Sequence, residues 1–211
     1  RLTRSEQERV FKPMNLRKII IATNVAETSL TIPGIRYVID TGLARISQYN
    51  PRSRTAGLPV RAISRSSADQ RKGRCGRVEN GICIRLFTEE DYLGRPLYPS
   101  PEILRSNLAG VILMMLALGL GDIDAFPFID RPAPKSIRDG IDILLELGAI
   151  EREADESQRK SDPWRLTERG RIMARLPIDP RIARMILEAK QEECLTEILV
   201  IAAALSSQDP R

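Results

Sequence analysis

The chain has 211 residues, of which 42% are hydrophobic and 29% are charged, and this composition predicts a globular protein of one large or a few small domains. Its formal net charge of +5 suits a polyanionic partner. The chain has no histidine, and its three cysteines form no CxxC pair. These absences argue against a structural zinc site and exclude every catalytic triad that uses imidazole.

Three further features concern where the protein works. Three scattered thiols are typical of a reducing compartment, so we expect a cytoplasmic protein. The longest apolar run, residues 109–120, is too short to cross a bilayer. The sequence opens without Met inside a charged segment, so we expect it to be part of a longer chain.

The first zone, up to about residue 98, reads as a parallel sheet with crossover helices. Continuous β-branched runs at 18–22, 36–40 and 82–87 predict strands buried on both faces. The polar stretch between the first two strands leaves room for a short helical turn, and a helix is expected at 68–77.

The segment 22–31, ATNVAETSLT, leaves the end of the first predicted strand. In open α/β sheets, ligands bind at the carboxyl ends of strands. Short polar side chains there suit sugar and phosphate oxygens, although an ordinary polar loop with a helix cap would have the same composition. These side chains are Thr23, Asn24, Thr28, Ser29 and Thr31.

Residues 43–63 predict a β-hairpin around the turn sequence Asn50-Pro51-Arg52-Ser53. From Arg45 to Arg77 there are nine Arg or Lys residues and one acid, Asp69. This density indicates either a phosphate-facing surface or a solubilising one. The hairpin candidates for nucleic-acid contact are Arg45, Arg52 and Arg54.

The segment 70–77, QRKGRCGR, carries the strongest chemical signal. On the expected helix, Gln70, Arg74 and Arg77 would share one face because they are spaced i, i+4, i+7. Two guanidinium groups and an amide suit a triphosphate, whereas a solvated basic helix is the plain alternative. The two glycines within it each cost a helix roughly 1 kcal/mol, so their presence indicates a close approach by a ligand or backbone.

The rest of the chain is mainly helical. Ser100-Pro101-Glu102 is a helix start, and the helix is expected to run to about 118. A helix at 137–147, a loop at 151–162 and a strand at 164–166 then predict a small winged-helix unit.

Capping signals continue to the end of the sequence. Thr167 begins a predicted helix to about 175, Asp179-Pro180 begins another, and 195–205 is a third, apolar helix. These helices predict the start of a bundle.

The segments 22–31 and 70–77 resemble motifs V and VI of the DEAH-box ATP-dependent RNA helicases, most closely those of the bacterial HrpA type. Both occur in the family's order, about forty residues apart, with a hairpin between them. The similarity covers nearly the whole chain. It continues through 100–105, 118–122, 147–150, 166–167 and 177–181.

The resemblance implies an α/β fold followed by an all-α region. Residues 1–98 would be the C-terminal part of the second RecA-like domain, including the hairpin at about 43–63. Residues 99–166 would be a winged-helix domain, and 167–211 the start of a helical ratchet bundle.

The resemblance also implies roles for individual residues. Arg74 would act as the arginine finger, and Arg77 would reach the nucleotide beside it. ATP and Mg would be held mainly by the first RecA-like domain, which is not among these 211 residues. Gln70 would contact the γ-phosphate or orient the attacking water, and Ser29 would link the nucleotide and RNA sites. Many relatives carry Asp where this chain has Pro33, so a ribose contact is not expected there.

On the RNA side, Thr23 and Asn24 would contact the backbone, with Thr28, Thr31 and the hairpin arginines beside them. The hairpin would act as a wedge or guide for the strand. The partner would be RNA, single-stranded or duplex with an overhang, with DNA left open. The sequence contains neither a G-x-x-x-x-G-K-[ST] phosphate loop nor a DEAH box. The chain alone is therefore expected neither to hydrolyse ATP nor to unwind RNA, and a non-motor binding or docking module is the alternative.

Overall fold

The computed structural model describes residues 3–12, 16–28, 31–77, 79–152 and 163–206. The chain folds into two compact units. The first consists of residues 1–48 and 56–100, and the second of residues 49–55 and 101–211. The tip of the predicted hairpin therefore belongs to the second unit, whereas its base belongs to the first.

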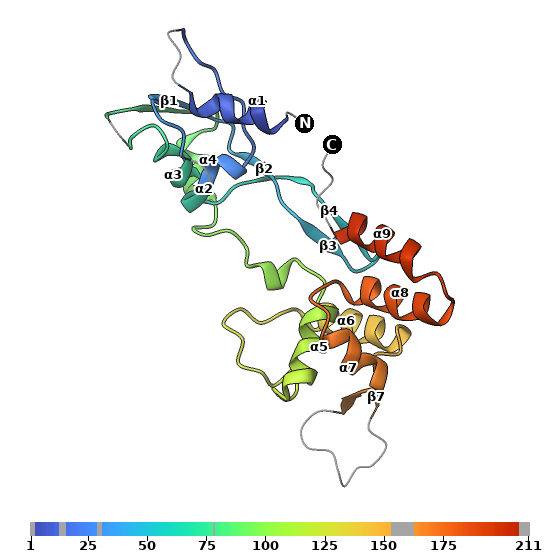
Figure 1. The fold of residues 1–211 in the computed structure, drawn as a ribbon. Helices are drawn as coiled ribbons and strands as arrows, with labels where there is room; N and C mark the ends of the chain where they lie inside the picture. The colour runs from blue at the N-terminus through green and yellow to red at the C-terminus, as the bar shows by residue number, and fades with distance from the viewer. Residues whose placement is uncertain (1–2, 13–15, 29–30, 78, 153–162, 207–211) are drawn as a thin grey trace. The chain divides into compact units, whose positions relative to one another are not determined.

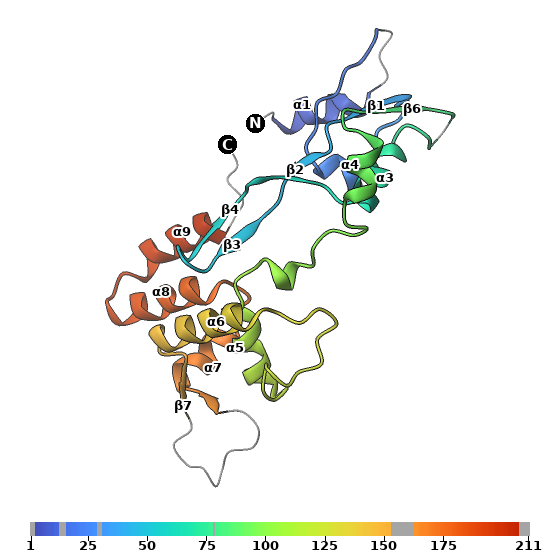
Figure 2. The same cartoon turned by 180° about the vertical axis from the view of Figure 1, so that it is seen from behind.

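The first unit contains a parallel strand pair. β1 (Tyr37–Asp40) runs beside β6 (Ile82–Arg85), with Tyr37 opposite Ile82 and Asp40 opposite Arg85 (Figure 2). Both strands come from predicted β-branched runs, and their parallel direction confirms the expected sheet type. A parallel pair requires a crossover connection, which here includes the hairpin and helix α3 (Arg65–Lys72).

The strand predicted at 18–22 is wrong. This segment forms no strand, and the side chains of Ile19 and Ile21 are 82% and 97% exposed. A strand exists only where a neighbour satisfies its backbone hydrogen bonds, and the part of the chain that the structure describes provides no such neighbour at 18–22.

The remaining helices of the first unit are short. α1 (Arg4–Glu8) continues into the 3₁₀ turn Arg9–Phe11, and α4 (Glu89–Gly94) follows β6. The helical turn expected between the first two predicted strands is α2 (Val25–Thr28).

Helix α3 differs from the helix predicted at 68–77. The Ser64 hydroxyl accepts the Ser67 amide at 3.2 Å and begins the helix earlier, and Gly73 is its C-cap. Residues 74–77 therefore form a turn after the helix, because Gly73 and Gly76 weaken helical continuation.

The hairpin predicted at 43–63 is confirmed in two paired pieces. At its base, β2 (Leu43–Arg45) runs antiparallel to β5 (Val60–Ala62). Nearer the turn, β3 (Gln48–Asn50) pairs with β4 (Thr55–Gly57). The Asn50 side chain accepts the Arg52 amide at 2.9 Å and so closes the turn.

The second unit follows the predicted order of helices, with two corrections. A strand at Ile150–Arg152 was not predicted, because 151–162 was expected to be a loop. The helix expected from 100 to 118 is split into a 3₁₀ turn and α5. Leu108 is the N-cap of α5, and just before it the Asn107 side chain accepts the Ala109 amide at 2.8 Å in a tight turn. In chain order the elements are the 3₁₀ turn Glu102–Leu104, α5 (Ala109–Leu118), α6 (Pro134–Glu146), β7 (Ile150–Arg152), β8 (Trp164–Leu166), α7 (Glu168–Ala174), α8 (Pro180–Gln191) and α9 (Leu195–Ser206).

Local capping confirms several of the predicted boundaries in this unit. Thr167 accepts the Gly170 amide at 3.0 Å, and Asp179 accepts the Arg181 amide at 2.8 Å with Pro180 at the first helical position. β7 and β8 pair antiparallel. Most of the loop predicted at 151–162 lies outside the described residues.

One apolar core holds this unit together. Leu108, Ile137 and Leu144 are almost completely buried in the same cluster as Met173, so α7 packs on the core that α5 and α6 form (Figure 1). A Cβ on Gly170 would lie 1.9 Å from the Ala149 carbonyl oxygen, which shows how closely α7 approaches the chain before β7. The predicted boundary at 166/167 is therefore not a boundary between separate cores.

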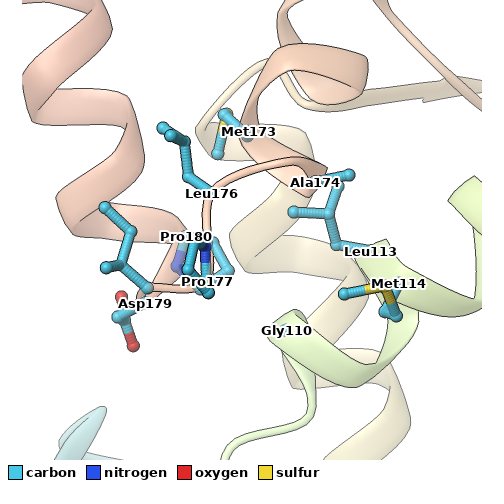
Figure 3. A pocket seen from close by; sticks show the side chains of 10 residues that line it. Gly110, Leu113, Met114, Met173, Ala174, Leu176, Pro177, Asp179 and Pro180 are labelled. Carbon is cyan, nitrogen blue, oxygen red and sulfur yellow. The ribbon is translucent and has the colours of Figure 1, made fainter.

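A shallow pocket of about 330 Å³ opens on the second unit (Figure 3). Its walls are the start of α5, the end of α7 and the connection 176–179 that leads into α8. The lining is apolar except for Asp179, which caps α8. Among the helices that the structure describes, none combines the length and the apolar character needed to cross a membrane.

Candidate functional site

The two motif segments lie against each other in the first unit. α2, which lies within the motif V segment (22–31), packs beside α3, which leads into the motif VI segment (70–77) (Figure 1). The contact consists of three arginines from the motif VI segment that donate hydrogen bonds to the motif V segment. These arginines are Arg71, Arg74 and Arg77.

Arg71 is the central residue of this contact. Its Nε donates to Glu27 Oε2 at 3.0 Å, and its Nη1 donates to Asp40 Oδ1 at 2.8 Å. Nη1 also reaches the Leu43 carbonyl at 3.2 Å. The side chains of Arg71, Glu27 and Asp40 are 16%, 11% and 0% exposed, so these ion pairs are largely screened from water. One guanidinium thus ties together the motif V helix, the end of β1 and the start of the hairpin.

Arg74 and Arg77 contact two separate points of the motif V segment, Glu27 within α2 and Thr31 at the end of the segment. Arg74 Nη2 donates to the backbone carbonyl of Glu27, and Arg77 Nη1 donates to the Thr31 hydroxyl. Both arginines lie in the turn after Gly73. A movement of this turn would therefore displace the motif V segment through these two hydrogen bonds.

The expected arrangement of Gln70, Arg74 and Arg77 on one helical face is wrong, because α3 ends before Arg74. Gln70 is an exposed residue near the end of the helix, and Arg77 is exposed in the turn that follows. Arg74 is partly buried. The three side chains still come from one short stretch, but a turn rather than a helix sets their directions.

The remaining motif V candidates are at the surface. Thr23 and Asn24 are exposed immediately before α2, and Thr28 is exposed at its end. Thr31 is exposed and accepts the hydrogen bond from Arg77. Ser29 lies outside the described residues. Pro33 is exposed.

An aromatic and ionic cluster fixes the opposite side of α3. Asp69 accepts hydrogen bonds from the Tyr92 hydroxyl at 2.8 Å and from Arg85 Nη2 at 2.7 Å, and the Arg85 guanidinium stacks 4.2 Å from the Tyr92 ring centroid. Burial acts to raise the pKa of Asp69, but the hydrogen bonds from Tyr92 and Arg85 outweigh it and hold this pKa below its ordinary value. The cluster ties α3 to β6 and α4.

The hairpin arginines fall into two groups. Arg45 and Arg52 are exposed. Arg54 instead forms ion pairs within the second unit, with Glu146 at 2.7 Å and with Asp139 at 3.5 Å.

Sequence reasoning missed the residues that organise this site. Arg71 lies inside the motif VI segment, but the assumed helical face placed it away from Gln70 and Arg74. Glu27 and Asp40 were not singled out either. The available signal was that Asp40 ends a predicted buried strand, where a carboxylate needs a cationic partner.

No group of three or more Cys, Asp or Glu residues within the described ranges could hold a metal ion. The groups that the motif V and motif VI segments bring together are guanidinium and hydroxyl donors. Such donors suit anionic oxygens, and planar guanidinium groups are especially suited to phosphate.

Two family descriptions match parts of the chain. Residues 1–79 match the "Helicase conserved C-terminal domain", and residues 179–210 match the "Helicase associated domain (HA2), ratchet-like". The first match contains both motif segments, and the second contains α8 and α9.

Similar proteins are found over the whole chain. It is 56% identical over 211 residues to "ATP-dependent RNA helicase HrpA" of Escherichia coli (strain K12), covering 100% of this chain and 16% of that protein. It is 44% identical over 204 residues to "ATP-dependent RNA helicase DHX33" of Mus musculus, covering 96% of this chain and 28% of that protein.

A solved structure shares the fold. The crystal structure of the Escherichia coli DExH-box NTPase HrpB superposes with a TM-score of 0.80 at 33% identity. The match covers 100% of this chain and 25% of the HrpB chain.

The parallel β1–β6 pair, the adjoining motif segments and the helical second unit define the C-terminal part of a helicase core, in which a second RecA-like domain precedes a helicase-associated region. Within that class, the chain is similar over its whole length to the ATP-dependent RNA helicases of the HrpA type. It spans 16% of the length of the HrpA relatives that it matches.

Proposed function

We propose that this chain is the part of an ATP-dependent RNA helicase that links ATP hydrolysis to movement along RNA and to unwinding. The observation that carries the proposal is the hydrogen bonding of Arg74 to Glu27 and of Arg77 to Thr31. The similarity to proteins named as ATP-dependent RNA helicases supports the same function.

On the nucleotide side, Arg74 acts as the arginine finger, and Arg77 and Gln70 contact the phosphates. A guanidinium there offsets the charge that develops on the phosphoryl oxygens as the γ-phosphate is transferred to water. Ser29 completes the contacts of this chain with the nucleotide. ATP and Mg are held mainly by the first RecA-like domain, which carries the phosphate loop in this family.

Arg74 can couple ATP hydrolysis to the motif V segment because one guanidinium carries several hydrogen-bond donors. Arginine carries five N–H donors, so Arg74 can keep the Glu27 carbonyl while its other donors reach a phosphate oxygen. A shift of Arg74 during hydrolysis then moves α2 directly. Arg71 limits this movement, because its ion pair with buried Asp40 keeps the start of the motif VI segment fixed to β1.

On the RNA side, exposed hydroxyl and amide groups of the motif V segment contact the sugar–phosphate backbone, and Arg45 and Arg52 add positive charge from the hairpin. Contacts of this kind position RNA without reading its sequence. The motif V contacts are Thr23, Asn24, Thr28 and Thr31. Arg54 has a different role, since its guanidinium is engaged by Glu146 and Asp139.

The second unit supplies further domains of the proposed helicase. Residues 99–166 act as a winged-helix domain and 167–211 as the start of a ratchet bundle, as the order of α5, α6, β7 and β8 supports. The absence of a carboxylate at Pro33 leaves the ribose without a contact at that position. We propose a cytoplasmic location from the three free cysteines.

The test uses the intact protein with an RNA duplex that carries a single-stranded overhang. RNA should stimulate ATP hydrolysis, and ATP should drive strand separation. Salt-dependent RNA binding without ATP hydrolysis would contradict the proposal and support a non-motor binding module. A DNA duplex of the same sequence, measured in parallel, establishes which nucleic acid is preferred.

A further inference from the structure

A second charged cluster lies wholly within the second unit, at the tip of the hairpin. Arg54 Nη1 donates to both carboxylate oxygens of Glu146 at 2.7 Å, and its Nε lies 3.5 Å from Asp139 Oδ1. Both acids are on α6, seven residues apart, and therefore face the same side of the helix. The hairpin tip is thus joined to α6 through one arginine side chain.

The Asp139 carboxylate of this cluster is held in place by burial, a hydrogen bond and close packing. The Asp139 side chain is 9% exposed, and Asn107 Nδ2 donates to its Oδ2 at 3.3 Å. A Cβ on the adjacent Gly140 would lie 2.7 Å from Ile112 Cδ1 and 3.1 Å from the Ala109 amide nitrogen. Close packing against α5 therefore fixes the carboxylate that Arg54 meets.

The backbone of the tip is also held by the second unit. The Tyr49 amide donates to the Arg105 carbonyl at 2.7 Å, and Arg181 Nη1 donates to the Arg54 carbonyl at 3.2 Å. Burial, and then the nearby Asp139 carboxylate, raise the pKa of the Tyr49 phenol.

Arg54 adopts an uncommon backbone conformation. Its φ of 52° lies in the left-handed region, which L-residues with a Cβ occupy only at an energetic cost. That cost is offset where the surrounding contacts over-determine the conformation. At Arg54 these contacts are the two carboxylates and the Arg181 guanidinium.

We propose that Arg54, Asp139 and Glu146 form a latch that fixes the hairpin tip to α6 and thereby positions the hairpin for strand separation. The positioning role rests on the proposed helicase function, whereas the latch itself does not. An exposed ion pair alone contributes little, but this cluster includes a buried carboxylate, a bifurcated charge-assisted contact from one guanidinium nitrogen and two hydrogen bonds to backbone carbonyls. Arg54 is a positioning residue rather than an RNA contact.

The latch is tested by amide hydrogen exchange in the intact protein. Glu146→Gln and Arg54→Gln should each raise the exchange rate of residues 49–55 by roughly two- to tenfold, and the double variant should add little to either. Glu151→Gln is the matched control, because Glu151 pairs with Arg165 at 2.9 Å on β7–β8 in the same unit. Unchanged exchange in both single variants, or the same rise in the control, would overturn the latch.

The positioning role is tested by comparing strand separation with ATP hydrolysis in the same variants. We expect RNA-stimulated hydrolysis to stay within twofold of wild type while the number of base pairs separated per ATP falls at least fivefold. An equal fall in both quantities, or no fall in either, would overturn the positioning role. If the wild-type protein shows no RNA-stimulated hydrolysis, the proposed function fails, and hydrogen exchange alone then decides whether the latch exists.

Discussion

The Arg71 guanidinium lies 2.8 Å from Oδ1 of Asp40, whose side chain is completely buried at the end of β1. The same Asp40 oxygen accepts the Gly42 amide at 2.9 Å, which shapes the turn that leads into β2. Through Arg71 this buried carboxylate also reaches Glu27 and the motif V helix. The ion pair with Asp40 therefore fixes the start of the motif VI segment to the sheet. Arg74 and Arg77 follow a few residues later in the chain, so their positions depend on this attachment.

Replacing Arg71 with Ala should destabilise the first unit by about 3 kcal/mol, because it leaves the buried Asp40 carboxylate without a cationic partner. Arg71→Lys should recover part of this loss, since an ammonium group can meet Asp40 but cannot also span to Glu27 with the same planar geometry. Denaturant titration measures both changes. Lys72→Ala, an exposed neighbour on the same helix, is the control, and equal losses at 71 and 72 would contradict the role assigned to Arg71.

Acid should weaken the cluster around Asp69. Its pKa is lowered in the folded state by hydrogen bonds from Tyr92 and Arg85, against the effect of burial. A lowered folded pKa means that the carboxylate contributes stability above its unfolded pKa of about 3.9 and loses that contribution as the pH falls through the folded value.

The free energy of unfolding should therefore differ between wild type and Asp69→Asn at pH 6, and this difference should shrink at pH values below about 4. Tyr92→Phe removes the hydroxyl that donates to Asp69 and should reduce the pH dependence without abolishing it. A difference that stays constant across this range would show that the charge of Asp69 is irrelevant.

Two helical glycines of the second unit make a matched pair for testing its packing. Gly170→Ala should destabilise the protein by about 3 kcal/mol, because the new Cβ would meet the Ala149 carbonyl oxygen at 1.9 Å. At Gly110 the nearest atom to a new Cβ, Pro180 Cδ, is 3.9 Å away. Gly110→Ala should therefore be neutral or stabilising by up to about 1 kcal/mol. Thermal unfolding of the two variants distinguishes them, and equal effects would contradict the close approach of α7.

Sequence patterns predicted the second unit well because its boundaries are local. The Thr167 and Asp179-Pro180 caps are each set by residues within one helical turn, and both appear where predicted. The strand predicted at 18–22 failed because pairing depends on a neighbour that a local pattern cannot reveal. The helix predicted at 68–77 was wrong because Gly73 ends the helix, whereas the spacing of the basic residues continues past it.

The sequence predicted which segments form the site, but it did not predict which side chains hold them together. The spacing of the motif V and motif VI segments indicated which residues belong together, and the structure brings these segments into contact. The bridge from Arg71 to Asp40 and Glu27 depends on which carboxylates become buried, which is a property of the folded unit. The engagement of Arg54 by α6 is likewise a long-range contact, 92 residues away from Glu146 in sequence.

The chain of 211 residues, purified alone, should show no ATP turnover with or without RNA, because its sequence contains no phosphate loop to hold the nucleotide. A steady-state phosphate-release assay measures this. Turnover above the buffer rate that persists through further purification would mean that the chain holds ATP by residues not considered in the proposed function.

The most direct test of the account is Arg74→Ala in the intact protein, measured as RNA-stimulated ATP turnover together with ATP affinity. If Arg74 stabilises charge during phosphoryl transfer, turnover should fall by about 10³-fold or more, while the ATP dissociation constant changes by less than about threefold. The Arg52→Ala variant, which removes an exposed arginine of the hairpin, should keep turnover at saturating RNA close to normal. Near-normal turnover by Arg74→Ala would contradict the central claim that the motif VI segment completes an ATP site.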